Sequence, residues 1–251
     1  MRARCLLALG FTLVLAGVSA AAARADQFYR VSGKDSFSVG ASNLRGDIAY
    51  DGIETLSIQP SAGATRYAAH VRYIRIDQGA RSDARATVTA VLLPSGEQID
   101  SSDDDPDYLA VLNQPFAVQL DAATLRALDH LRGSVPFTFP SPMTGSTLQG
   151  TLRHLGDAPV DSERAVGILF TARGPLRGSL PGRPSTALSG TITMNGTAYY
   201  DQRTALLCAL DATMVVTGTI HSPDGSLQPL SVTYRRTLRK TTPTPTAEAH
   251  R

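Results

Sequence analysis

The densest group of side chains able to do chemistry is a run of carboxylates after position 99. Carboxylate oxygens are the ligands that Ca²⁺ prefers in proteins. The run does not fit an EF-hand loop, because its sixth residue is aspartate rather than glycine and its twelfth, Val111, is not glutamate. Carboxylates this dense, interrupted by Pro106, are typical of a solvated loop. We therefore expect an acidic loop here, with a Ca²⁺ site as the alternative and no other cofactor. The residues concerned are Asp100, Asp103, Asp104, Asp105 and Asp107.

The histidines form no catalytic motif. They are His70, His130, His154, His221 and His250, and none has the H-x-H, H-x-x-x-H or H-E-x-x-H spacing of a metal site. The sequence also lacks a G-x-S-x-G nucleophile motif and a glycine-rich phosphate loop. We assign no catalytic or cofactor-binding residue. The enzymatic alternative is a serine, histidine and carboxylate set assembled in space, for which a histidine in a cleft beside a serine or carboxylate would be the sign; His154 with Asp157 we interpret as structural.

Two residues of one apolar strand pattern also carry reactive groups. Cys208 stands on the apolar face between Leu206 and Leu210, so we expect a buried thiol that packs as a small hydrophobe. Asp211 stands on the opposite face, and we expect it either to face solvent or to pair with an arginine of a neighbouring strand such as Arg235.

The first 25 residues have the pattern of a secretory signal peptide. Arg2 and Arg4 precede an uncharged, leucine-rich stretch, and Ala23-Arg24-Ala25 is a small-x-small cleavage site before Asp26. The pattern predicts a periplasmic or secreted protein with no transmembrane segment after cleavage. Cleavage removes three of the 24 basic residues and no acidic one, which changes the net charge from +2 to about −1 and leaves Cys208 as the lone cysteine. A net charge this small gives no argument for a nucleic-acid partner.

Alternation of apolar and polar residues with period two dominates the rest of the chain. It is clearest in 84–92, 205–220 and 230–238, where valine and threonine are frequent. Asp201-Gln202-Arg203-Thr204 and Pro223-Asp224-Gly225-Ser226 are turn signals between long runs. Such a pattern favours antiparallel sheets with one wetted face. We expect a mainly β protein of one or two long curved antiparallel sheets, either a sandwich or a half-barrel, with 188–239 as a three-stranded meander.

One segment, 121–132, has helical spacing. Leu125, Leu128 and Leu131 recur every third residue, Asp121 is a good N-cap, and Gly133 follows the end. The proline-rich stretch after this short amphipathic helix could divide the chain into halves 26–120 and 134–240. We favour a single β-rich domain over 26–240, followed by a disordered tail over 241–251.

The hairpin that begins at Gly196-Thr-Ala-Tyr-Tyr-Asp201 and continues into a long alternating strand resembles a hairpin of uncharacterised exported bacterial β-proteins. Their architecture is similar to the periplasmic half-barrels of the lipoprotein-carrier type. The resemblance covers about 50 residues of pattern and no functional motif. It implies an envelope protein that could bind an apolar ligand, and it assigns no residue a role.

The function we predict is therefore that of a non-enzymatic periplasmic binding or envelope-assembly factor, with an apolar ligand or an envelope protein as partner. An outer-membrane β-barrel protein and an unmarked enzyme such as a hydrolase are the alternatives. An apolar groove would be lined by one face of the long strands, and the simpler interpretation is that this face forms the core. Its residues are Leu206, Leu210, Met214, Val216 and Tyr234.

Overall fold

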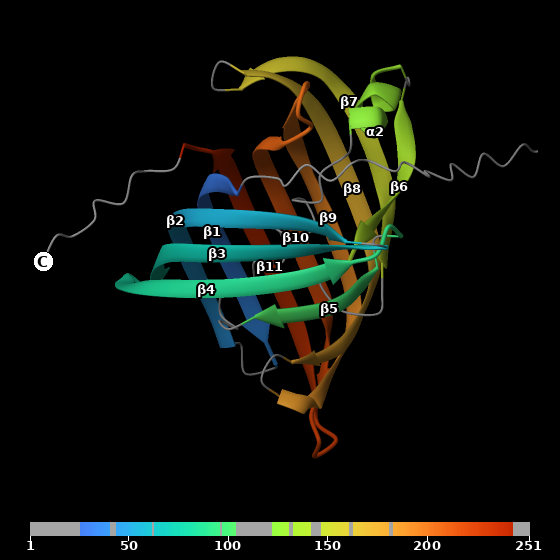
Figure 1. Ribbon diagram of the computed structural model, residues 1–251. Coiled ribbons are helices and arrows are strands. Elements are labelled where there is room, and N and C mark those ends of the chain that lie inside the picture. The colour runs from blue at the N-terminus through green and yellow to red at the C-terminus, as the bar shows by residue number, and fades with distance from the viewer. Residues whose placement is uncertain are drawn as a thin grey trace, which may run out of the picture.

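The computed structural model describes residues 26–40, 44–61, 63–95, 97–103, 122–130, 133–141, 147–160, 163–180 and 183–242. The predicted signal peptide, the chain beyond 242 and most of the acidic run lie outside these residues. The described chain consists almost entirely of strands (Figure 1). In chain order the elements are β1 (Gln27–Val39), β2 (Leu44–Ser61), β3 (Ala64–Asp77), β4 (Ala80–Leu92), β5 (Gln98–Asp103), α2 (Ala122–Asp129), β6 (Ser134–Pro140), β7 (Thr147–Val160), β8 (Glu163–Leu180), β9 (Arg183–Asp201), β10 (Leu207–His221) and β11 (Leu227–Lys240).

All the described strands belong to one antiparallel sheet of 11 strands, in the order β5-β4-β3-β2-β1-β11-β10-β9-β8-β7-β6. The first strand of the chain pairs with the last, so Val31 lies opposite Leu238 and the two halves of the sequence join at the centre of the sheet. The edge strands β5 and β6 do not pair with each other, and the sheet stays open rather than closing into a barrel. The prediction of a mainly β protein with a long antiparallel sheet is confirmed.

The sheet folds over on itself, and its core lies between the two halves. In Figure 1, β2–β5 run across the face of the sheet formed by β9–β11. One hydrophobic cluster accordingly contains Leu56 and Ala69 from β2 and β3 together with Met214 of β10. Strands of 13 to 19 residues allow this, because a long twisted strand coils enough to bring one face around.

Alternation in the sequence corresponds to the two faces of the sheet. In β4, Ala86, Val88, Ala90 and Leu92 are buried, and the residues between them are not. We call the buried side of the sheet its inner face and the solvent-facing side its outer face.

The three-stranded meander is confirmed as β9, β10 and β11. At the first turn, the Asp201 carboxylate accepts hydrogen bonds from the main-chain N–H of Arg203 (2.9 Å) and from the N–H and hydroxyl of Thr204 (2.7 and 2.9 Å). At the second, Gly225 adopts a φ of 82°, which glycine tolerates, and Asp224 accepts a hydrogen bond from the N–H of Ser226 (2.9 Å). Both turns are therefore built by the aspartate and glycine chemistry that the sequence indicates.

The predicted helix is present as α2. Leu125 and Leu128 are buried and belong to the main core cluster, while Leu131 lies outside the described residues. The helix sits over β7 at one end of the sheet, where Asp129 approaches His154 with 3.7 Å between the carboxylate and Nε2 (Figure 1). No helix within the described ranges is long and apolar enough to span a bilayer.

Candidate functional site

Four of the five residues predicted to line an apolar groove are core residues. Leu210, Met214, Val216 and Tyr234 are between 0% and 8% exposed and belong to one continuous hydrophobic cluster. Their side chains pack against the half of the sheet that folds over them, so their apolar surface is already used in packing.

Leu206 is the exception and does not belong to this cluster. Leu206 precedes β10 and is half-buried, whereas the next residue, Leu207, is fully buried in the core. The pairing of β10 with β9 shifts register between Leu207 and Ala209, which is a β-bulge. The bulge interrupts the period-two alternation, so counting back from Leu210 assigns Leu206 to the wrong face.

An ion pair lies inside the molecule, where the sequence pattern suggested only apolar residues. Arg236 of β11 contacts both carboxylate oxygens of Asp35 on β1, one of them through Nη2 at 3.0 Å. Its guanidinium carbon lies 4.9 Å from the centre of the Tyr50 ring. A Cβ at Gly33 would stand 2.7 Å from Nη1 of Arg236, so the guanidinium occupies space that only glycine leaves open. Burial and the nearby Asp35 carboxylate raise the pKa of Tyr50.

Arg236 was not predicted from the sequence, although its position in the strand pattern indicates a buried residue. Period two places it on the same face as Tyr234 and Leu238, and both of these are buried. A charged residue inside an apolar alternation indicates a buried partner more often than an error in the pattern.

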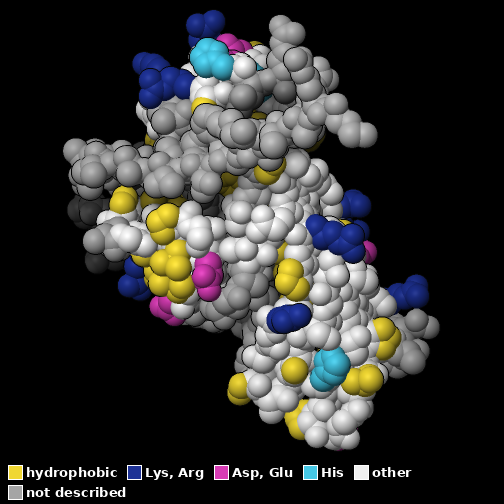
Figure 2. All heavy atoms as spheres, turned by 90° about the vertical axis from the view of Figure 1, so that its right-hand side faces the viewer, with side chains coloured by type: hydrophobic (Ala, Val, Ile, Leu, Met, Phe, Trp, Pro, Cys, Tyr) yellow, Lys and Arg dark blue, Asp and Glu magenta, His cyan; other side chains and the backbone are white. Residues whose placement is uncertain are grey.

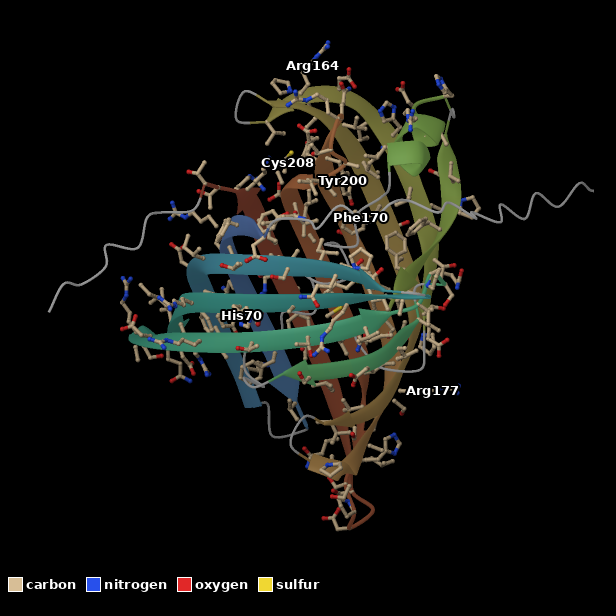
Figure 3. The ribbon with its side chains drawn as sticks, viewed as in Figure 1. His70, Arg164, Phe170, Arg177, Tyr200 and Cys208 are labelled. Atoms are coloured by element: carbon tan, nitrogen blue, oxygen red, sulfur yellow. The ribbon has the colours of Figure 1, made fainter. Side chains whose placement is uncertain are left out.

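A second group of buried polar residues surrounds the predicted buried thiol. Cys208 is 2% exposed, as predicted, and lies at the same end of the sheet as Tyr200 (Figure 3). The Tyr29 hydroxyl hydrogen-bonds with the side-chain amide oxygen of Gln27 and with the main-chain oxygen of Leu207 (3.1 Å). Burial, followed by the charge of Glu54, raises the pKa of Tyr29 well above its usual value. These groups make a hydrogen-bonded interior, and within the described ranges no three histidine, cysteine or carboxylate side chains are grouped as a metal would need.

One of the described histidines contacts a serine. His221 of β10 and Ser189 of β9 are 2.7 Å apart between Nε2 and Oγ, on the outer face and exposed. His70 of β3 lies 3.4 Å from the Thr87 hydroxyl and is exposed (Figure 3). Neither pair is among the residues that line the two surface depressions along β1 and β11.

His154 lies beside a different carboxylate from the one that the sequence suggested, Asp157. Asp157 accepts a hydrogen bond from the side-chain amide of Gln202 (2.6 Å), and His154 faces Asp129 of α2 instead. A bulge between His154 and Gly156, where φ is 98°, separates the two positions along β7.

The acidic run is described only in part. Asp100 and Asp103 belong to β5, where they stand opposite Val91 and Val88 of β4. Asp104, Asp105 and Asp107 lie outside the described residues, so the Ca²⁺ alternative stays a prediction.

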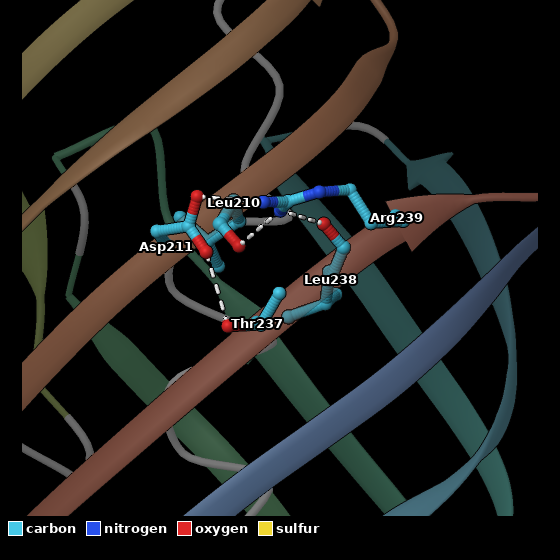
Figure 4. Close-up of polar contacts among 5 residues, drawn as sticks. All are labelled: Leu210, Asp211, Thr237, Leu238 and Arg239. Carbon is cyan, nitrogen blue, oxygen red and sulfur yellow. Dashed lines mark hydrogen bonds and ion pairs between the residues drawn. The ribbon is translucent and has the colours of Figure 1, made fainter. Parts of the chain in front are cut away.

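Asp211 is paired with an arginine, but not with the predicted one. Its carboxylate accepts hydrogen bonds from Arg239 (2.8 Å) and from the Thr237 hydroxyl (3.0 Å), both on β11 (Figure 4). Arg239 also donates to the main-chain oxygens of Leu210 and Leu238. In the pairing of β10 with β11, Asp211 stands opposite Thr237, whereas Arg235 stands opposite Thr213. The register therefore leaves Arg235 without the carboxylate that the sequence suggested for it.

Two adjoining depressions run along β1 and β11 on the outer face. The first measures about 440 Å³ and its outward side chains include Ser32, Lys34, Asn195, Thr213, Arg235 and Thr237. The second measures about 700 Å³ and its outward side chains are Ser36, Ser38, Arg45, Asp47, Ser231 and Thr233. Lys34 and Ser36 are successive outward residues of β1, as are Arg235 and Thr233 of β11, so the two depressions follow one another along these strands. We call the two together the outer groove.

Charges in the outer groove are partly balanced. The ammonium of Lys34 lies 3.0 Å from the Asp47 carboxylate. A hydrogen bond from Ser36 and the contacts with Lys34 lower the pKa of Asp47. Arg235, exposed and directly opposite Lys34, forms no hydrogen bond or ion pair through its side chain with any described residue. The groove therefore combines many hydroxyls with a guanidinium, that of Arg235, which no described carboxylate compensates.

Uncharged polar side chains cover the outer face beyond the groove as well. Figure 2 views the molecule from the side of β6–β8 and shows mainly uncharged polar and backbone atoms, with basic and hydrophobic side chains among them. Outward residues such as Thr151 and Thr171 pair across strands through their hydroxyls (3.1 Å). This surface is one that water or a polar ligand can cover.

In comparisons with known proteins, the chain matches no family model and no curated protein.

Proposed function

We propose that this protein is an exported, non-enzymatic binding or assembly factor of the bacterial cell envelope, and that it binds its partner in the outer groove. The observation that carries the proposal is the exposed Arg235, uncompensated by any described carboxylate and placed opposite Lys34 in a hydroxyl-lined depression. The signal-peptide pattern of residues 1–25 supports export. The resemblance to half-barrels of the lipoprotein-carrier type supports a role in the envelope.

The outer groove is a better candidate than the interior for this role. An apolar ligand between the two halves of the sheet would have to displace side chains such as Leu210 and Met214, which are 0% and 1% exposed. Opening a packed core loses the burial of those side chains, about 1.5–3 kcal/mol for each one. A polar partner on the outer face displaces only water.

The outer face also argues against the outer-membrane alternative. A sheet in contact with lipid presents an apolar band outward. Here the outward side chains of β1 and β11 include Ser36, Ser38, Ser231 and Thr233, and most of the apolar ones, such as Val31 and Leu238, point into the core.

A groove-filling variant tests the proposal. Thr233→Trp places a large side chain in the outer groove, and Thr171→Trp places the same side chain on the outer face of β8, outside the groove. Immobilised wild-type protein and both variants are incubated with fractionated envelope lipids, glycans and proteins, and the retained material is quantified by mass spectrometry. We expect one component to be retained by the wild type and by Thr171→Trp and lost from Thr233→Trp. Equal retention by all three proteins would exclude the outer groove as the binding surface.

A further inference from the structure

The outer groove has the charge, lining and length to accept one class of ligand. We infer that it binds a linear acidic polysaccharide, a chain of sugars that carries carboxylates, with a carboxylate seated between Arg235 and Lys34. The inference rests on the proposed function and adds the chemical class of the partner.

The charge argument begins with the register of β1 and β11. Lys34 and Arg235 stand directly opposite each other, and like charges at such positions destabilise a sheet. The Lys34 ammonium has a counter-ion in Asp47, but the Arg235 guanidinium has none among the described residues. Asp211 also lines the groove, but its carboxylate is held by Arg239 and Thr237. A ligand carboxylate at this point would relieve the repulsion, and a guanidinium can bind it through two parallel hydrogen bonds.

The lining of the groove suits sugar hydroxyls. Each serine or threonine hydroxyl both donates and accepts hydrogen bonds, as sugar hydroxyls do. Seven such side chains follow the groove on both sides of the cation pair: Ser32, Ser36, Ser38, Thr213, Ser231, Thr233 and Thr237.

The shape of the groove suits a linear chain. From Ser32 to Ser38 the groove follows six residue steps of β1, or about 20 Å at 3.4 Å per residue. A depression of this length along two paired strands can hold an extended polymer over several units, whereas a single small anion would use only the part beside Arg235.

A membrane surface fits the groove less well. Binding to lipid headgroups gains from apolar side chains that enter the interface. The described large hydrophobic residues with high exposure are Ile53, Ile99, Leu155 and Leu227, and none of them lines the groove.

Titration calorimetry with oligogalacturonate, a linear chain of acidic sugars, tests the inference on the purified protein. Arg235→Gln removes the charge, and Arg235→Lys keeps a charge without the paired hydrogen bonds. Arg177→Gln is the matched control, because Arg177 is an exposed arginine of β8 outside the groove (Figure 3). We expect Arg235→Gln to weaken binding about tenfold or more, Arg235→Lys to weaken it less, and Arg177→Gln to leave it unchanged. Affinity should fall as salt is raised.

Three further probes decide between ligand classes: neutral cello-oligosaccharides, a single-stranded DNA oligonucleotide, and phosphatidylglycerol vesicles. Tighter binding of the acidic sugar than of all three supports the inference. Equal affinity for DNA or vesicles would show that charge alone is recognised and would overturn it. If the neutral sugar binds as tightly as the acidic one and Thr233→Trp abolishes that binding, the inference of an acidic ligand is overturned. The proposed function, binding in the outer groove, would then still stand. If Thr233→Trp retains the envelope component as well as the wild type does, both the inference and the proposed function are contradicted.

Discussion

Arg236 and Asp35 are the most demanding residues of the interior. Both side chains are almost completely removed from water, and an ion in that position loses several kcal/mol of hydration. Two contacts between guanidinium and carboxylate and the Tyr50 ring beside the cation offset that loss. Gly33, which has no side chain, leaves the space that the guanidinium occupies. The pair joins β1 to β11, which are the two ends of the described chain, so it favours that pairing over a shifted register.

Breaking this pair should be far more costly than replacing it. We expect Asp35→Ala to lower the free energy of unfolding by about 3–5 kcal/mol, because a buried guanidinium then has no carboxylate. The double variant Asp35→Leu with Arg236→Met should be much closer to the wild type, since it leaves no buried charge. Urea unfolding followed by circular dichroism measures both. If the double variant is as unstable as the single one, the contribution of the pair is packing rather than charge.

At the scale of elements, the meander depends on its turns. The long strands β9 and β10 reverse within a few residues, and Ala205 adopts a φ of 56°, which non-glycine residues rarely do. Asp201 compensates through three hydrogen bonds to its carboxylate. Burial by itself would raise the pKa of Asp201, but the hydrogen bonds from Thr204 and Arg203 outweigh it and lower the pKa below the usual 3.8.

The lowered pKa of Asp201 predicts that the protein loses part of its stability in acid. A carboxyl group with a lower pKa in the folded state stabilises the fold above its unfolded pKa, and this contribution is lost as pH falls through the folded value. We expect Asp201→Asn to be less stable than the wild type by about 1–3 kcal/mol at pH 7, and the difference to shrink below about pH 3.8. Asp51→Asn, which breaks only the exposed ion pair with Arg30, is the control and should cost under about 1 kcal/mol. Thermal unfolding between pH 2 and 7 would show a constant difference if the turn does not depend on the charge.

Across the whole molecule, the local patterns of the sequence predicted more than its long-range pairings. Alternation and turn residues indicated β4, β10, β11 and the meander, since these depend on neighbours in the chain. The bulge after Leu207 was not predictable, because it satisfies packing against β9. The outer groove could not be predicted either: Lys34 and Arg235 are about 200 residues apart and meet only through the register of β1 and β11. For the same reason, a net charge near −1 does not describe the local charge of the groove.

Labelling of the Cys208 thiol measures whether the whole sheet opens as one cooperative unit. It is 2% exposed on β10, a strand paired on both sides, so a reagent can reach it only when the sheet opens. In a Cys5→Ser background, we expect thiol labelling in native buffer to be slow and to accelerate with urea in parallel with loss of the circular dichroism signal. Leu227→Cys, at a position that is 65% exposed, should label at once and serves as the positive control. Rapid labelling of Cys208 while the sheet signal remains native would contradict a single cooperative core, and would instead identify the bulge at Leu207–Ala209 as a site of local opening.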